Sequence, residues 1–182
     1  NLRCGGGSHA EQTANIMIAF EKELLAHPAD VVLVVGDVTS TMACSIVAQK
    51  LHTKVAHVEA GIRSGDWSMP EEINRLVTDS ITNYFFTTSK TANKNLLESG
   101  INKENIYFVG NTMIDTLIKQ QPNFIKPKLF DDLKLSSKNY CVITLHRPAN
   151  VDEEQKLKDT INEIILNSDN MPLFFPMHPR TK

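Results

Sequence analysis

A run of five apolar residues at positions 31–35, Val-Val-Leu-Val-Val, constrains the fold of this chain more than any other feature. Four of the five residues are β-branched and the run ends at Gly36, so it predicts a strand. A strand without polar residues on either face is typical of parallel sheets, in which both faces are covered. We therefore expect residues 31–35 to be buried on both sides.

Segments with helical and strand-like patterns alternate along the first part of the chain. Helical periodicity occurs at 11–25, 39–51, 69–82 and 90–97, and strand-like runs occur at 55–58, 84–88 and 106–109. Strands that alternate with helices of this length indicate βαβ units. We therefore predict an α/β fold with a doubly wound, mostly parallel sheet.

The composition changes near residue 119. Residues 119–138 contain two prolines, several lysines and paired Asp and Ser residues, which is typical of a linker. Beyond it, strand-like runs at 140–145 and 173–175 flank a helical pattern at 152–166. We expect a first Rossmann-like domain over 1–118 without its first strand, a linker over 119–138, and the start of a second Rossmann-like domain over 139–182.

Charge and cysteine content exclude several classes of protein. The chain has 19 Lys and Arg against 21 Asp and Glu, and this balance argues against a nucleic-acid or anionic membrane surface. No apolar run approaches the ~18 residues of a membrane span. Three widely spaced cysteines exclude a disulfide framework and a CxxC zinc site, so we expect a cytoplasmic protein.

Polar side chains follow each of four predicted strands. Asp37, Glu59 and His146 come just after the strands that end near 35, 58 and 145, and His178 follows the strand at 173–175. Ligands of open α/β sheets bind at this carboxyl edge. Carboxylates move protons and cations bind phosphate, so the pattern predicts a site for an anionic ligand.

Structural roles could also account for several of these residues. Asp37 could cap the helix that begins near Thr39. Ser68 and Glu71 fit a capping box at the start of the helix predicted over 69–82. Glu71 and Arg75 are four residues apart and could form only a surface pair.

Residues 57–63, His-Val-Glu-Ala-Gly-Ile-Arg, and residues 70–75, Pro-Glu-Glu-Ile-Asn-Arg, resemble signature segments of the non-hydrolysing UDP-N-acetylglucosamine (UDP-GlcNAc) 2-epimerases. Shorter family-like segments occur in the family's order at 36–41, 110–115 and 144–147. The resemblance covers nearly the whole chain. It implies two Rossmann-like domains arranged as in glycosyltransferases of type B, with the nucleotide sugar in the cleft.

The resemblance also implies a reaction, the interconversion of UDP-GlcNAc and UDP-N-acetylmannosamine (UDP-ManNAc). The family removes the proton at C2, expels UDP to give 2-acetamidoglucal, and adds UDP back with protonation on the opposite face. This chemistry requires no metal or redox cofactor. Family analogy further implies a homodimer that supplies sugar units for surface polysaccharide, with a UDP-sugar substrate and neither nucleic acid nor membrane as a partner.

Seven side chains match family motifs and receive roles from the resemblance. Four are catalytic and three bind the substrate: Asp37, Glu59, Glu71 and His146, then Arg75, Arg147 and His178. Arg147 and His178 could instead belong to the regulatory UDP-GlcNAc site that some relatives have. The sequence leaves open which carboxylate faces C2 in each direction.

Length is the main departure from the family, whose members are about twice as long. An opening strand and a later Ser-Gly-Gly segment that holds UDP have no counterpart here, so we expect these 182 residues alone to be inactive. Three alternatives stay open. They are a hydrolysing 2-epimerase that releases ManNAc and UDP, an epimerase of a modified UDP-sugar such as a 2,3-diacetamido uronate, and a non-catalytic binding module.

Overall fold

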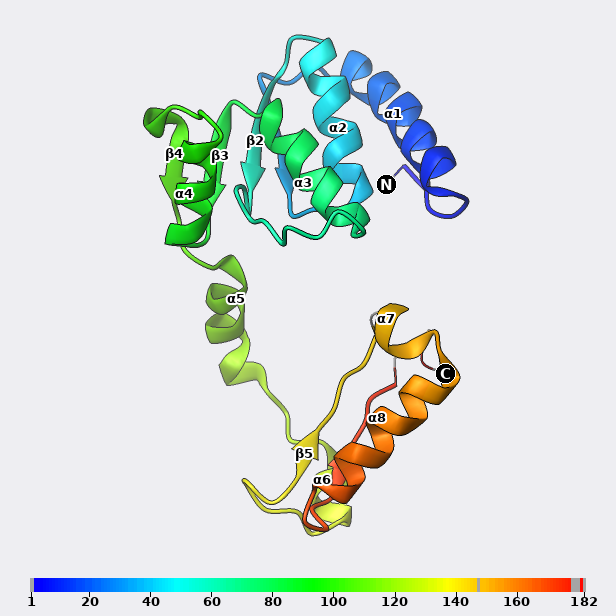
Figure 1. Ribbon diagram of the computed structural model, residues 1–182. Helices are drawn as coiled ribbons and strands as arrows, with labels where there is room; N and C mark the ends of the chain where they lie inside the picture. The colour runs from blue at the N-terminus through cyan, green and yellow to red at the C-terminus, as the bar shows by residue number, and fades with distance from the viewer. Residues whose placement is uncertain (1, 147, 178–180, 182) are drawn as a thin grey trace. The chain divides into compact units, whose positions relative to one another are not determined.

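The structure, a computed structural model, describes residues 2–146, 148–177 and 181. It divides into two compact units, Asn1–Gln121 and Pro122–Lys182, and each has its own parallel sheet (Figure 1). Among the described residues, no helix is long and apolar enough to cross a membrane. The predicted α/β class with parallel strands is confirmed.

Helices and strands alternate through the first unit, close to the predicted ranges. In chain order they are α1 (His9–Ala26), β1 (Val31–Val35), α2 (Thr39–Lys50), β2 (Lys54–Val58), α3 (Pro70–Ser80), β3 (Tyr84–Thr87), α4 (Lys90–Glu98), η1 (Lys103–Asn105), β4 (Ile106–Phe108) and α5 (Thr112–Gln120). The strands pair in the order β1-β2-β3-β4, and all three pairings are parallel. The carboxyl ends of all four strands therefore lie along one edge of the sheet.

The sheet register places the core on one face of the sheet. Val34, His57 and Phe85 are direct neighbours across β1, β2 and β3, and all three are buried. Val34 packs with Leu24 of α1 and Ala48 of α2, while Phe85 packs with Leu96 of α4. Helices α1, α2 and α4 therefore cover the face on which His57 lies.

The opposite face of β1 is exposed, so the prediction that residues 31–35 are buried on both sides is wrong. Val31, Leu33 and Val35 alternate along the strand with exposed fractions of 42%, 61% and 54%. The physical reason is that β1 is an edge strand and its helices pack only on the face of Val34. An apolar run alone does not tell one-sided from two-sided burial.

The second unit contains short strands and one long helix. After η2 (Gln121–Asn123), which crosses the boundary between the units, its elements are α6 (Lys128–Asp132), β5 (Cys141–Val142), α7 (Pro148–Val151), α8 (Glu154–Leu166) and β6 (Leu173–Phe174). The strands β5 and β6 pair in parallel, and Tyr140 packs edge-on against Phe130 and Phe174. The segment predicted as a linker thus holds the helix α6, whose Phe130 joins this small core.

Candidate active site

Two of the predicted carboxylates follow neighbouring strands at the carboxyl edge of the first sheet. Glu59 comes directly after β2, and Asp37 comes two residues after β1. Val35 pairs with Val58, and the Gly36 amide donates to the Val58 carbonyl at 3.0 Å. This continued pairing brings the two loops side by side where a ligand of a parallel sheet is expected.

Arg75 on α3 holds the Asp37 side chain. Its Nε and Nη2 donate to Asp37 Oδ2 at 3.0 Å and 2.5 Å, and Asn74 Nδ2 donates to the Asp37 carbonyl at 2.8 Å. Asp37 does not cap α2, because the N-cap is Val38 and no side chain caps that end. The capping interpretation is therefore wrong, and Asp37 is a half-buried carboxylate tied to α3.

The same arginine also binds Glu72, which is only 2% exposed. Arg75 Nη1 donates to Glu72 at 2.8 Å, and the amides of Ser64 and Gly65 each donate to it at 3.0 Å. Burial raises the pKa of Glu72, but these hydrogen bonds outweigh it and lower the pKa to about 2. Glu72 is therefore an ionised clamp between α3 and the loop after Glu59.

Glu59 combines a strained backbone with an unpaired side chain. Its φ is +72°, a left-handed conformation that is unfavourable for glutamate. Its half-buried carboxylate has no hydrogen bond or ion pair with the part of the chain that the structure describes. Gly36, also at φ +72°, lies beside it, and a Cβ there would be in van der Waals contact with Glu59 Oε2 at 3.4 Å. Glu59 is thus held in place with its oxygens available.

Glu71 stands in the first turn of α3 and is also unpaired among the described residues. The predicted capping box is wrong, because the N-cap is Met69 and the Ser68 hydroxyl donates to Asp66 Oδ1 at 2.6 Å. The predicted surface pair with Arg75 is also wrong, since Arg75 binds Asp37 and Glu72 instead. Glu71 is therefore a half-buried carboxylate at the positive end of a helix.

His57 and Asp79 are the centre of a buried network that the sequence interpretation did not single out as functional. His57 Nδ1 lies 2.8 Å from Asp79 Oδ1, and His57 Nε2 lies 2.8 Å from the Gly36 carbonyl. Asp79 Oδ2 accepts from the Gly61 amide at 3.0 Å and from Arg63 Nη1 at 2.6 Å. The spacing of Glu72 and Asp79 could have revealed it, because residues seven apart share one face of a helix.

His146 belongs to the second unit, where it follows β5 as predicted. It is exposed, and its Nδ1 lies 3.3 Å from Thr144 Oγ1. Two predicted substrate-binding residues, Arg147 and His178, lie outside the described residues. The first unit therefore brings together Asp37, Glu59 and Arg75, with Glu71 on the same helix as Arg75.

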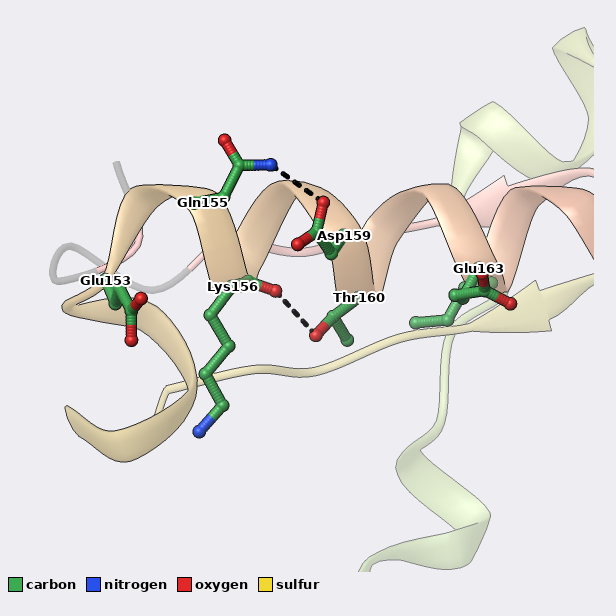
Figure 2. Close-up of a pocket in the computed structure, with 7 residues that line it drawn as sticks. Glu153, Gln155, Lys156, Asp159, Thr160 and Glu163 are labelled. Atoms are coloured by element: carbon green, nitrogen blue, oxygen red, sulfur yellow. Dashed lines mark hydrogen bonds between the residues drawn. The ribbon is translucent and has the colours of Figure 1, made fainter.

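A surface cavity of about 550 Å³ lies elsewhere, along α8 of the second unit. Figure 2 shows hydrogen bonds within the helix from Gln155 to Asp159 and from Thr160 to the Lys156 carbonyl. This cavity is lined by none of the predicted site residues. Within the described ranges, no group of three or more His, Cys, Asp or Glu side chains could hold a metal ion. The carboxylates at the sheet edge can transfer protons.

Comparison with known proteins decides the family. The profile described as UDP-N-acetylglucosamine 2-epimerase matches residues 1–182, the full length of the chain.

The chain belongs to the UDP-N-acetylglucosamine 2-epimerase family.

Relatives of known name lie within this epimerase family. A UDP-N-acetylglucosamine 2-epimerase homolog of Methanococcus maripaludis is 44% identical over the whole chain, which covers 51% of that protein. A UDP-2,3-diacetamido-2,3-dideoxy-D-glucuronate 2-epimerase of Pseudomonas aeruginosa is 35% identical, with 97% of this chain and 50% of that one covered. The chain thus spans about half the length of these relatives.

A solved epimerase structure agrees with the fold. The crystal structure of the Methanocaldococcus jannaschii UDP-GlcNAc 2-epimerase, in complex with UDP-GlcNAc and UDP, superimposes with a TM-score of 0.87. It is 42% identical, and the match covers 100% of this chain and 51% of that one. The family resemblance of residues 57–63 and 70–75 is therefore confirmed at the level of the whole chain.

Proposed function

We propose that the chain carries the carboxylate side of the active site of an enzyme that interconverts UDP-GlcNAc and UDP-ManNAc. The observation that carries this proposal is the contrast among three neighbouring carboxylates. Asp37 is bound by Arg75, whereas Glu59 and Glu71 are half-buried and unpaired among the described residues. Unpaired carboxylates can take up and return a proton, which is what inversion of the weakly acidic C2 centre requires.

The reaction inverts C2 in two halves. A base removes the C2 proton as UDP leaves, which gives 2-acetamidoglucal, and an acid on the other face protonates C2 as UDP adds back. Glu59 and Glu71 supply these two groups in our proposal, and Asp37 with Arg75 orients the sugar. From family analogy, His146, Arg147 and His178 stabilise the anionic UDP as it departs.

The first test follows UDP-GlcNAc by proton NMR in D2O, with the complete, untrimmed enzyme. We expect UDP-ManNAc to appear together with deuterium at C2 in both sugars. Free ManNAc plus UDP would instead establish the hydrolysing reaction. No exchange at C2 would overturn the assignment to UDP-GlcNAc.

A modified UDP-sugar is the second candidate substrate, because the Pseudomonas relative is named for a 2,3-diacetamido glucuronate. The same NMR experiment with UDP-2,3-diacetamido-2,3-dideoxy-D-glucuronate distinguishes the two by their relative kcat/KM. We also propose, from family analogy, a homodimer that works in the cytoplasm and supplies surface polysaccharide. Light scattering tests the dimer, and we expect these 182 residues alone to show no turnover.

A further inference from the structure

Asp79 lies in the last turn of α3, seven residues beyond Glu72, and its side chain is 4% exposed. It therefore stands in the interior rather than among the carboxylates of the proposed active site. A buried carboxylate is costly unless charges or hydrogen bonds compensate it. Both Asp79 oxygens have such partners. The partners of one oxygen contact the loop that contains Asp37, and those of the other belong to the loop after Glu59.

One oxygen leads to the Asp37 loop. Asp79 Oδ1 lies 2.8 Å from His57 Nδ1, and the other ring nitrogen lies 2.8 Å from the Gly36 carbonyl. A carbonyl only accepts, so His57 Nε2 must carry a proton. The contact fixes the peptide that immediately precedes Asp37.

The other oxygen leads to the Glu59 loop. Asp79 Oδ2 accepts from the Gly61 amide at 3.0 Å and from Arg63 Nη1 at 2.6 Å. Gly61 is two residues beyond Glu59, whose left-handed backbone needs support from its surroundings. A backbone amide and a charged guanidinium therefore hold this oxygen, so Asp79 ties the loop after Glu59 to α3.

We propose that Asp79 is a positioning residue that sets the spacing between Asp37 and Glu59, through His57 on one side and through Gly61 and Arg63 on the other. The groups that face His57 are Asp79 from α3 and the Gly36 carbonyl after β1, with Arg63 on the far side of Asp79. The inference rests on the proposed function, because it assigns Asp79 to that reaction. Asp79 touches no substrate and acts through the two loops.

The test compares Asp79→Asn with Leu24→Ala in the complete enzyme. Asn at 79 presents an NH2 group either to His57 or to Gly61 and Arg63, so one side of the network breaks. A misplacement of ~1 Å can reduce turnover about 100-fold. We expect kcat to fall about 100-fold while KM for UDP-GlcNAc changes less than about threefold. Leu24→Ala shortens a core side chain that takes no part in the hydrogen bonds of the network, and we expect it to lower Tm and leave kcat unchanged.

Nitrogen NMR of the wild-type protein gives a readout that does not depend on folding of the variant. We expect Nε2 of His57 to carry a proton, because it faces the Gly36 carbonyl, and an unprotonated Nε2 would overturn the proposal. An active wild type with an equally active Asp79→Asn variant would overturn the positioning role alone. A wild type without C2 exchange on either UDP-sugar would overturn the proposed function, and the positioning role with it.

Discussion

Among single residues, the unpaired carboxylate of Glu59 differs most from its neighbours. Asp37 and Glu72 share the charge of Arg75, whereas Glu59 reaches the carboxyl edge of the sheet on a left-handed backbone. A side chain held there without an internal partner is placed to act on something outside the protein. On this difference we propose that Glu59 reacts and that Arg75 positions Asp37.

Glu59→Gln keeps the shape of the side chain and removes its capacity to accept a proton. We expect kcat to fall by about 10²–10⁴ and the dissociation constant for UDP-GlcNAc to change little. Steady-state kinetics and calorimetric titration in the complete enzyme check both values. The control is Glu98→Gln, on the exposed surface of α4, which should match the wild type. Nearly unchanged turnover in Glu59→Gln would contradict the central assignment.

A second prediction concerns Glu72 and the way in which the stability of the protein depends on pH. The pKa of Glu72 is lowered from 4.5 to about 2. The ionised side chain therefore stabilises the fold fully above pH 4.5, and this stabilisation is lost as the pH falls toward 2. By linkage, acidification from pH 7 to pH 3 removes about 2 kcal/mol at this residue. Over the same pH range, we expect the free energy of unfolding of Glu72→Gln to fall by about 2 kcal/mol less than that of the wild type.

Urea unfolding of the wild type and the variant at both pH values measures the Glu72 effect. At pH 7 the variant should already be destabilised, by about 3 kcal/mol, because a buried ion pair is broken. Glu98→Gln again serves as the control, since its exposed pair with Lys94 at 3.6 Å contributes little. If the stabilities of Glu72→Gln and the wild type depended on pH in the same way, Glu72 would not be an ionised, buried contact between α3 and the loop after Glu59.

At the scale of elements, α3 and α4 hold the loop after Glu59 from two sides. Glu72 and Asp79 of α3 bind the amides of Ser64, Gly65 and Gly61. On the other side, Asn95 of α4 donates to the Gly61 carbonyl at 2.9 Å. The loop is therefore fixed by helix side chains although it has no regular structure of its own.

Close packing of α4 against Gly61 leads to a matched pair of variants. Gly61 and Gly65 both have positive φ, but a Cβ at Gly61 would lie 2.5 Å from the Ala92 carbonyl, whereas nothing lies within 4 Å at Gly65. We expect Gly65→Ala to cost about 1 kcal/mol from the backbone alone. Gly61→Ala should cost at least about 2 kcal/mol more, because α4 must move. Equal losses by urea unfolding would show that α4 does not pack tightly there.

The sequence predicted the elements of the first unit well and their polar contacts poorly. Strand 31–35 and the helices near 39–50 and 90–98 follow from apolar patterns and local signals, which is why they agree with the structure. The capping roles of Asp37 and Ser68 failed because Arg75 and Asp66 compete for those side chains. The Arg75–Asp37 contact joins residues 38 positions apart, which local patterns do not reveal. Asp66 lies two residues before Ser68, so there a local turn replaces the cap.

At the scale of the whole molecule, the chain consists of two units that meet in sequence at residues 121 and 122. Backbone between compact units has few supporting contacts and is cut first by proteases. We expect brief trypsin treatment to cleave first after Lys119 and Lys128, because the short helices α5 and α6 that contain them have no buried residue. Cleavage after Lys50 or Lys54 should be slower, because α2 and β2 contribute buried residues to the first unit. Mass spectrometry identifies the fragments, and early cleavage at Lys50 would contradict this division.

The left-handed backbone of Glu59 also has a consequence for how this protein can change over generations. Glycine adopts that conformation without strain, so Glu59→Gly should raise stability by about 1 kcal/mol while it abolishes turnover. A lineage released from selection for the reaction would therefore gain by replacing this glutamate. Its persistence at position 59 in a descendant would mark continued use of the enzyme, and a glycine there would mark a scaffold kept for another purpose.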